Sequence, residues 1–116
     1  MYQYFTEKEF NNIGCSLSDM DEEFMRKLDR IRKICNFPFH INSAYRDKET
    51  ELKKGRNGLS SHCKGVAVDI KALKDSEKYL IVQTALSQGI TRIGIAKNYI
   101  HLDDDKEKNQ NVIWTY

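Results

Sequence analysis

The sequence lacks the features that would direct it into a membrane or along a secretory route. Its 116 residues contain no apolar run approaching the length of a membrane span, and the N-terminal segment MYQYFTEKEF has early acidic residues where a signal peptide is apolar. We therefore expect a protein that is synthesised in the cytoplasm without a signal peptide and that does not bind a membrane. Action elsewhere would require release by another route.

The sequence also has little excess charge of either sign. Lysine and arginine together number 19 and aspartate and glutamate 17, which leaves a formal net charge of +2. Nucleic-acid-binding domains usually carry a clear basic excess, whereas Lys53, Lys54 and Arg56 form only a short patch. The composition therefore predicts no nucleic-acid partner.

Paired cysteines are missing as well. Cys15, Cys35 and Cys63 are odd in number, and none belongs to a C-x-x-C unit. This usage is typical of free thiols in a reducing compartment. Cys63 directly follows His62, and we interpret it as a small packed residue in preference to a metal ligand or nucleophile.

Internal repeats, low-complexity tracts and Gly/Ser linkers are absent too. A chain of 116 residues that is 40% hydrophobic can build a single core but not two. We predict one domain over residues 1–116. No feature of the sequence specifies an oligomer, and we expect a monomer.

Helical patterns dominate the first half of the chain and recur once later. They predict helices over residues 6–10, 20–35, 47–55 and 75–89. Ser18 or Asp19 is the expected N-cap of the helix over 20–35. In the helix over 75–89, the spacing predicts an apolar face made of Tyr79, Val82 and Leu86.

Strand patterns appear mainly towards the C-terminus. They cover FHINSAYR, GVAVDI, TRIGIA, NYIHLDD and NVIWTY, at residues 39–46, 65–70, 91–96, 98–104 and 111–116. Helices that come first and strands that come last favour an α+β fold, with a mainly antiparallel sheet and flanking helices. Trp114 and Tyr116 are expected to pack the last strand against the sheet, or to line a groove.

Two of these strands combine an apolar face with a polar one. Side chains alternate across a strand, so in GVAVDI the bulky Val68 and Ile70 share one face, while Ala67 and Asp69 share the other. Small residues followed by a carboxylate leave space beside the sheet for a bound group.

The same alternation in NYIHLDD places Ile100 and Leu102 on one face and Tyr99, His101 and Asp103 on the other. His62, in the loop before GVAVDI, can join His101 and Asp69. Two imidazoles and one carboxylate form a three-ligand zinc site whose fourth position stays open for water, as in catalytic sites. Polar residues at a surface or in a hydrogen-bonded core would give the same pattern, and the H-E-x-x-H motif is absent.

The combined motif carries a resemblance to a known family. It consists of S-x-H-x-x-G-x-A-x-D-I at residues 60–70, then H-x-D at 101–103, with S-A-Y-R upstream at 43–46. This pattern resembles the zinc D-alanyl-D-alanine peptidases, which share their fold with the Hedgehog signalling domain. The short peptidase type found in phage and bacterial genomes, which opens with a segment like YFTEKEF, is the most similar.

The resemblance implies that His62, Asp69 and His101 bind zinc. It also implies that Arg46 lies beside the site and steadies the substrate carbonyl or a developing oxyanion, a role that suits a permanently charged guanidinium. The alternative for Arg46 is a surface salt bridge with Asp47 or Glu49.

Ser60 and Tyr99 complete the expected site on its substrate side. Ser60, two residues before a ligand, is expected to shape the loop or to form a hydrogen bond near the metal. Tyr99 shares the polar face of His101.

The general base is the feature in which this chain departs from the family. Many relatives have an acidic residue three positions before the last histidine ligand, where this sequence has Asn98. Asp103 is a substitute base, or else it holds the His101 imidazole in place. Asp104 and Asp105 are expected to form a solvated acidic turn.

The implied function is zinc-dependent hydrolysis of peptide bonds in peptidoglycan stem peptides, by a D-Ala-type carboxypeptidase or an endopeptidase. Such a protein would act on the cell wall after release, for example as a phage product. The alternative, which Asn98 favours, is a non-catalytic zinc-containing module of the same fold that binds peptidoglycan or a protein.

Overall fold

The computed structural model describes residues 1–116. Along the chain the elements are α1 (Glu7–Asn11), the 3-10 helix η1 (Leu17–Asp19), α2 (Glu22–Cys35), β1 (Ile41–Ser43), α3 (Lys48–Lys53), the 3-10 helix η2 (Ser61–Lys64), β2 (Ala67–Lys71), α4 (Asp75–Ser87), β3 (Arg92–Ile95), β4 (Tyr99–Asp103) and β5 (Val112–Thr115). No helix combines the length and the apolar character that crossing a bilayer requires.

The α2 helix begins two residues later than the sequence suggested. Asp21 is its N-cap, because the Asp21 carboxylate accepts a hydrogen bond of 2.9 Å from the Phe24 N–H. The prediction of Ser18 or Asp19 as the cap was wrong, since both residues belong to η1, where the Asp19 side chain accepts from the Ser16 N–H. Asn36 ends α2 in the left-handed conformation, with a φ of 59°.

The predicted apolar face of α4 was right for Val82, which packs against the core, but wrong for Tyr79 and Leu86. Ile81, Thr84 and Ala85 are buried, whereas Tyr79 and Leu86 are exposed. The helix packs against α2 and β4. Because α4 lies close to both elements, it turns towards them the face whose side chains are smaller overall, and Tyr79 and Leu86 remain on the solvent side.

The five strands form one sheet in the order β1-β2-β4-β3-β5. The pairs β1–β2, β2–β4 and β4–β3 are antiparallel, and only β3–β5 is parallel. This arrangement confirms the expected α+β fold with a mainly antiparallel sheet. The first strand is shorter than the predicted span of 39–46, because a bulge between Ile41 and Ser43 shifts its register against β2.

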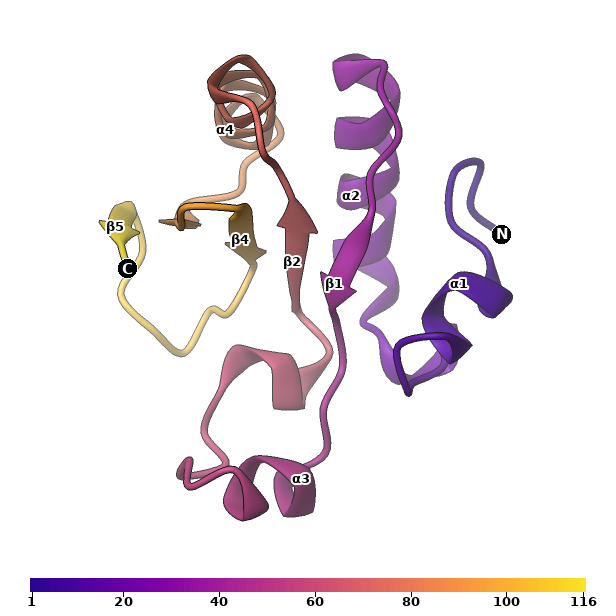
Figure 1. Ribbon diagram of the computed structural model, residues 1–116, viewed down its shortest axis with the longest axis vertical. Coiled ribbons are helices and arrows are strands. Elements are labelled where there is room, and N and C mark those ends of the chain that lie inside the picture. The colour runs from indigo at the N-terminus through magenta and orange to yellow at the C-terminus, as the bar shows by residue number, and fades with distance from the viewer.

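The core lies on one side of this sheet. A single cluster of 20 buried residues joins α2 and α4 to the apolar faces of the strands, including Val68, Ile70, Ile100 and Leu102. Figure 1 shows α4 at one end of the molecule and α3, with the turn that leads into β2, at the opposite end. The other face of the sheet is therefore left for the polar side chains of β2 and β4.

We expect Ile100→Ala to lower the free energy of unfolding by about 2–5 kcal/mol, because Ile100 is fully buried on the core side of β4 and the loss leaves a cavity. Urea denaturation measures this change. Ile113→Ala is the matched control, since Ile113 is exposed on β5, and it should change stability by less than about 0.5 kcal/mol. Equal losses in the two variants would contradict the placement of the core.

Candidate metal centre

One row of cross-strand neighbours organises the open face of the sheet. Reading from β1 to β5, the paired positions are Ser43, Asp69, His101, Gly94 and Trp114. Directly paired residues on neighbouring strands point to the same face. The register therefore brings Asp69 and His101 together, with Ser43 on one side and an aromatic ring beyond Gly94 on the other.

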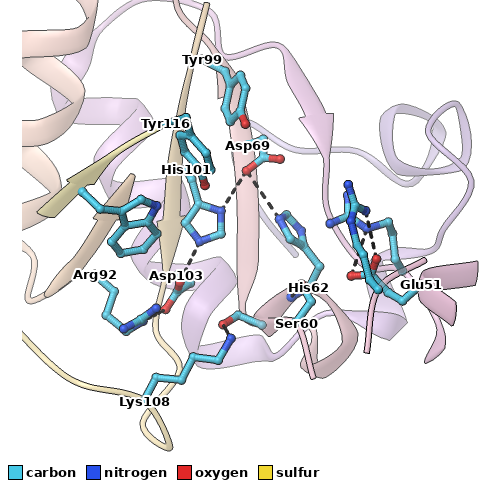
Figure 2. A pocket seen from close by; sticks show the side chains of 14 residues that line it. Glu51, Ser60, His62, Asp69, Arg92, Tyr99, His101, Asp103, Lys108 and Tyr116 are labelled. Carbon is cyan, nitrogen blue, oxygen red and sulfur yellow. Dashed lines mark hydrogen bonds and ion pairs between the residues drawn. The ribbon is translucent and has the colours of Figure 1, made fainter. Parts of the chain in front are cut away.

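His62, Asp69 and His101 converge at the centre of this row. Each offers a ligand atom, and the three atoms all lie within 4.8 Å of one another. Asp69 Oδ1 lies 2.9 Å from His101 Nδ1 and 3.5 Å from His62 Nε2 (Figure 2). Both histidines are buried. The structure thus brings together the three residues that the sequence proposed as metal ligands.

The outer nitrogen of each imidazole has its own partner. His62 Nδ1 lies 2.7 Å from the Ala44 carbonyl oxygen, which only accepts, so Nδ1 carries the proton and Nε2 is free to act as a ligand. His101 Nε2 lies 2.7 Å from Asp103 Oδ2, which leaves Nδ1 facing Asp69. This pattern fits a metal ion, because the nitrogens that point inward are the ones that can bind it.

The ionisation of Asp69 agrees with this fit, whereas the raised pKa of His101 means that a metal ion would displace a proton from its ring. Burial alone would raise the pKa of Asp69, but the contacts with His101 and His62 outweigh it and hold the pKa well below its usual range. Burial would lower the pKa of His101, yet the hydrogen bonds to Asp103 and Asp69 raise it overall. An anionic carboxylate that draws positive charge towards itself is suited to a cation.

Asp103 lies behind His101 with both carboxylate oxygens engaged. Oδ2 faces His101 Nε2, and Oδ1 accepts hydrogen bonds from Arg92 Nε at 2.7 Å and from the Asp105 N–H at 3.1 Å. The Asp103 side chain is 1% exposed. Its contacts are those of a carboxylate that holds an imidazole in place, the second of the two roles that its sequence position suggested.

The acidic turn after β4 is not solvated as expected. Asp105 is buried, and its carboxylate accepts hydrogen bonds from Ser61 Oγ at 2.7 Å and from Lys64 Nζ at 3.0 Å. Asp104 pairs with Lys27 at 2.9 Å. The prediction was wrong because Asp105 joins the end of β4 to η2, the turn that carries His62.

Arg46 forms neither of the surface salt bridges considered from the sequence. Asp47 instead caps α3, and Glu49 pairs with Lys53. The Arg46 guanidinium donates a hydrogen bond to Ser43 Oγ, and its Nε lies 3.5 Å from Glu51 Oε1. It therefore lies at the β1 end of the site, beside the residue that pairs with Asp69.

These side chains line a cavity of about 300 Å³ that contains the three candidate ligands. Ser60 and Tyr99 line it as well, and Ser60 Oγ accepts a hydrogen bond of 3.2 Å from the His62 N–H. Four charged residues of the lining were not predicted from the sequence. Glu51, Arg56 and Lys108 lie in polar segments without any distinguishing pattern, and Arg92 lies in β3.

An aromatic wall closes the β5 side of the cavity. The rings of Tyr99 and Tyr116 lie 5.5 Å apart (Figure 2). The Trp114 ring lies 5.5 Å from that of His101. Gly94 makes this approach possible, since a Cβ there would be 2.7 Å from Trp114 Nε1. Trp114 and Tyr116 therefore line the cavity as well as ending the sheet.

The comparison with known families agrees with the fold and the donor set. Three ligand atoms on the open face of a mainly antiparallel α+β sheet define a candidate metallohydrolase. The sequence matches the peptidase M15 family over residues 3–103, and the chain belongs to this family. No curated protein matches it. Family membership confirms the resemblance to the zinc D-alanyl-D-alanine peptidases, and β5, with Trp114 and Tyr116, lies beyond the matched residues.

We predict that Gly94→Ala shifts the fluorescence of Trp114, the only tryptophan, because the added Cβ displaces its ring from beside His101. The emission maximum should move to longer wavelength, with a loss of stability of about 1–3 kcal/mol from overpacking. Thr115→Ala, at an exposed neighbour on β5, is the control and should leave the emission unchanged. Unchanged emission in Gly94→Ala would show that the wall does not depend on this glycine.

Asp105 makes the stability of the protein depend on pH. Burial would raise the pKa of Asp105, but hydrogen bonds from Ser61 and Lys64 outweigh it and lower the pKa overall. A lowered pKa contributes stability that is present above the unfolded value of about 3.9 and is lost as the pH falls through the folded value.

We therefore expect Asp105→Asn to be less stable than the wild type by about 2 kcal/mol at pH 7, with the difference shrinking below about pH 4. Denaturation series from pH 7 to pH 3 test this. Asp75→Asn, at an exposed position of α4, should change stability by less than about 1 kcal/mol. A difference that is constant with pH would refute an ionised Asp105.

Proposed function

We propose that the protein is a zinc-dependent peptidase that cleaves peptide bonds in peptidoglycan stem peptides. The observation that carries this proposal is the convergence of His62 Nε2, Asp69 and His101 Nδ1, with both outer imidazole nitrogens already held by other groups. Membership of a peptidase family supports the reaction class. The choice of stem peptides as substrate rests on the family resemblance.

Zinc is the metal that this donor set suits best. Two imidazole nitrogens and one carboxylate oxygen are ligands that zinc binds readily, and three protein ligands leave a fourth position open. Bound zinc would polarise a substrate carbonyl and lower the pKa of a water molecule. Both histidines are buried, whereas Asp69 is partly exposed to the cavity.

The remaining residues of the cavity orient the substrate. Arg46 presents a permanent positive charge at the β1 end of the site, where it can bind the oxygen of the scissile carbonyl as negative charge develops. Tyr99 would contact the peptide on the aromatic side, while Ser60 holds the turn that carries His62.

Asp103 serves this chemistry indirectly. It fixes the His101 ring so that Nδ1 faces Asp69, and Arg92 holds the carboxylate in turn. Asn98, at the position where many relatives have an acid, is exposed in the turn before β4.

One observation favours a second candidate function, a non-catalytic zinc-containing module that binds peptidoglycan or a protein. The cavity lining contains three carboxylates, those of Glu51, Asp69 and Asp103. Each is already paired, with arginine, with histidine or with both. No free carboxylate faces the ligands as a proton acceptor.

Substitution of His62 tests zinc binding and hydrolysis, and substitution of His40 provides the control. We expect the wild type to bind about one zinc ion per chain and to release soluble fragments from purified peptidoglycan. His62→Ala should lose both properties, because two ligands do not hold zinc. His40→Ala is the matched control, since His40 is exposed and lies outside the cavity, and it should keep both.

Calorimetry measures zinc binding, and mass spectrometry of the fragments identifies the bond that is cut. Zinc binding without any released fragment would favour the non-catalytic module. Failure of the wild type to bind zinc would overturn both candidate functions.

A further inference from the structure

Glu51 is the one fully buried glutamate in the protein, and neither the sequence motif nor the metal site accounts for it. It lies on α3 with none of its surface exposed, yet it lines the cavity that holds the candidate ligands. A carboxylate removed from water in this way costs several kcal/mol unless cations accompany it. The burial of Glu51 therefore implies that cationic side chains bind its carboxylate.

Two arginines share this carboxylate. Arg56, after α3, donates a hydrogen bond of 3.0 Å from Nη1 to Glu51 Oε2. Arg46, before α3, places Nε 3.5 Å from Glu51 Oε1. Arg56 alone would neutralise the carboxylate, and its side chain is half-exposed, whereas Arg46 is mostly buried inside the site. The second contact holds Arg46 in the cavity.

Arg46 is held on two sides as a result. Its guanidinium donates to Ser43 Oγ, and Ser43 is the β1 residue that pairs with Asp69. Its buried Nε has no hydrogen-bond partner of good geometry, and neither has Glu51 Oε1. The attraction between the two is therefore mainly one of charge, which orients the guanidinium without using all of its donors.

We propose that Glu51 is a positioning residue, which keeps the Arg46 guanidinium aimed at the reacting carbonyl beside the metal site. This inference rests on the proposed peptidase function. It adds to that function a residue that acts through Arg46 and does not touch the substrate.

Glu51 is poorly suited to the alternative role of general base. Both of its oxygens face arginine side chains. Burial would raise the pKa of Glu51, but Arg56 and Arg46 outweigh that effect and lower the pKa, which weakens the carboxylate as a proton acceptor. The position of Glu51 therefore suits it to orienting the Arg46 guanidinium.

Kinetics of the zinc-loaded full chain on a stem peptide test the proposal. Glu51→Gln should lower kcat by about 10- to 100-fold with little change in KM and with zinc affinity unchanged, because a misplaced guanidinium loses contact mainly with the transition state. Glu49→Gln is the matched control, an exposed glutamate on the same helix, and should match the wild type.

A double-mutant cycle separates positioning from a merely structural role. Arg46→Lys should lower kcat by itself, and adding Glu51→Gln to it should cause almost no further loss, because Glu51 acts through Arg46. Losses that multiply in the double variant would overturn the proposal. Glu51→Asp, which keeps the charge but shortens its reach, should give an intermediate kcat, and full activity in that variant would also overturn it.

A second measurement needs no activity and no metal. In ¹H–¹⁵N spectra the buried Nε–H of Arg46 should exchange slowly with water in the wild type and rapidly in Glu51→Gln, with Arg46→Lys identifying the signal. Equal exchange would overturn the proposal. Absence of hydrolysis by the wild type would overturn the proposed function and this inference with it, whereas an active wild type with an unaffected Glu51→Gln would overturn this inference alone.

Discussion

The pairing of β2 with β4 places Asp69 opposite His101, and the other parts of the site depend on this register. A one-residue shift of β2 would turn Asp69 into the core and bring Val68 to the open face, and a one-residue shift of β4 would do the same for His101 and Leu102. The apolar residues on either side prevent that shift, because they are buried against α2 and α4. The same packing that stabilises the sheet thus keeps the two candidate ligands together.

Each carboxylate around the site is paired with nearby histidine or arginine side chains, so that its negative charge is balanced locally. Asp69 is paired with two histidines, Asp103 with His101 and Arg92, and Glu51 with two arginines. Asp105 extends this arrangement outward through Ser61, next to His62. Buried charges with partners of this kind hold side chains in fixed directions, which a site with three ligands from separate segments requires. The arrangement also leaves the cavity lining without an unpaired carboxylate.

Much of the fold could be predicted because it follows from local periodicity. Alternation in GVAVDI and NYIHLDD predicted the polar and apolar faces of β2 and β4, and the helical spacing predicted α2. The apolar face of α4 could not be predicted this way. Its sequence offers two stripes of similar hydrophobicity, and contact with α2 and β4 selects the stripe with the smaller side chains.

The sequence by itself determined the residues that can act as ligands and the strand faces on which Asp69 and His101 lie, since both depend on residue type and on a period of two. Only the tertiary structure decided that Asp105 is buried, that Trp114 lies beside His101, and that Glu51 lines the same cavity as the candidate ligands. These contacts join segments whose spacing along the chain carries no signal. They follow from the strand order and from the parallel addition of β5, which are properties of the folded chain as a whole.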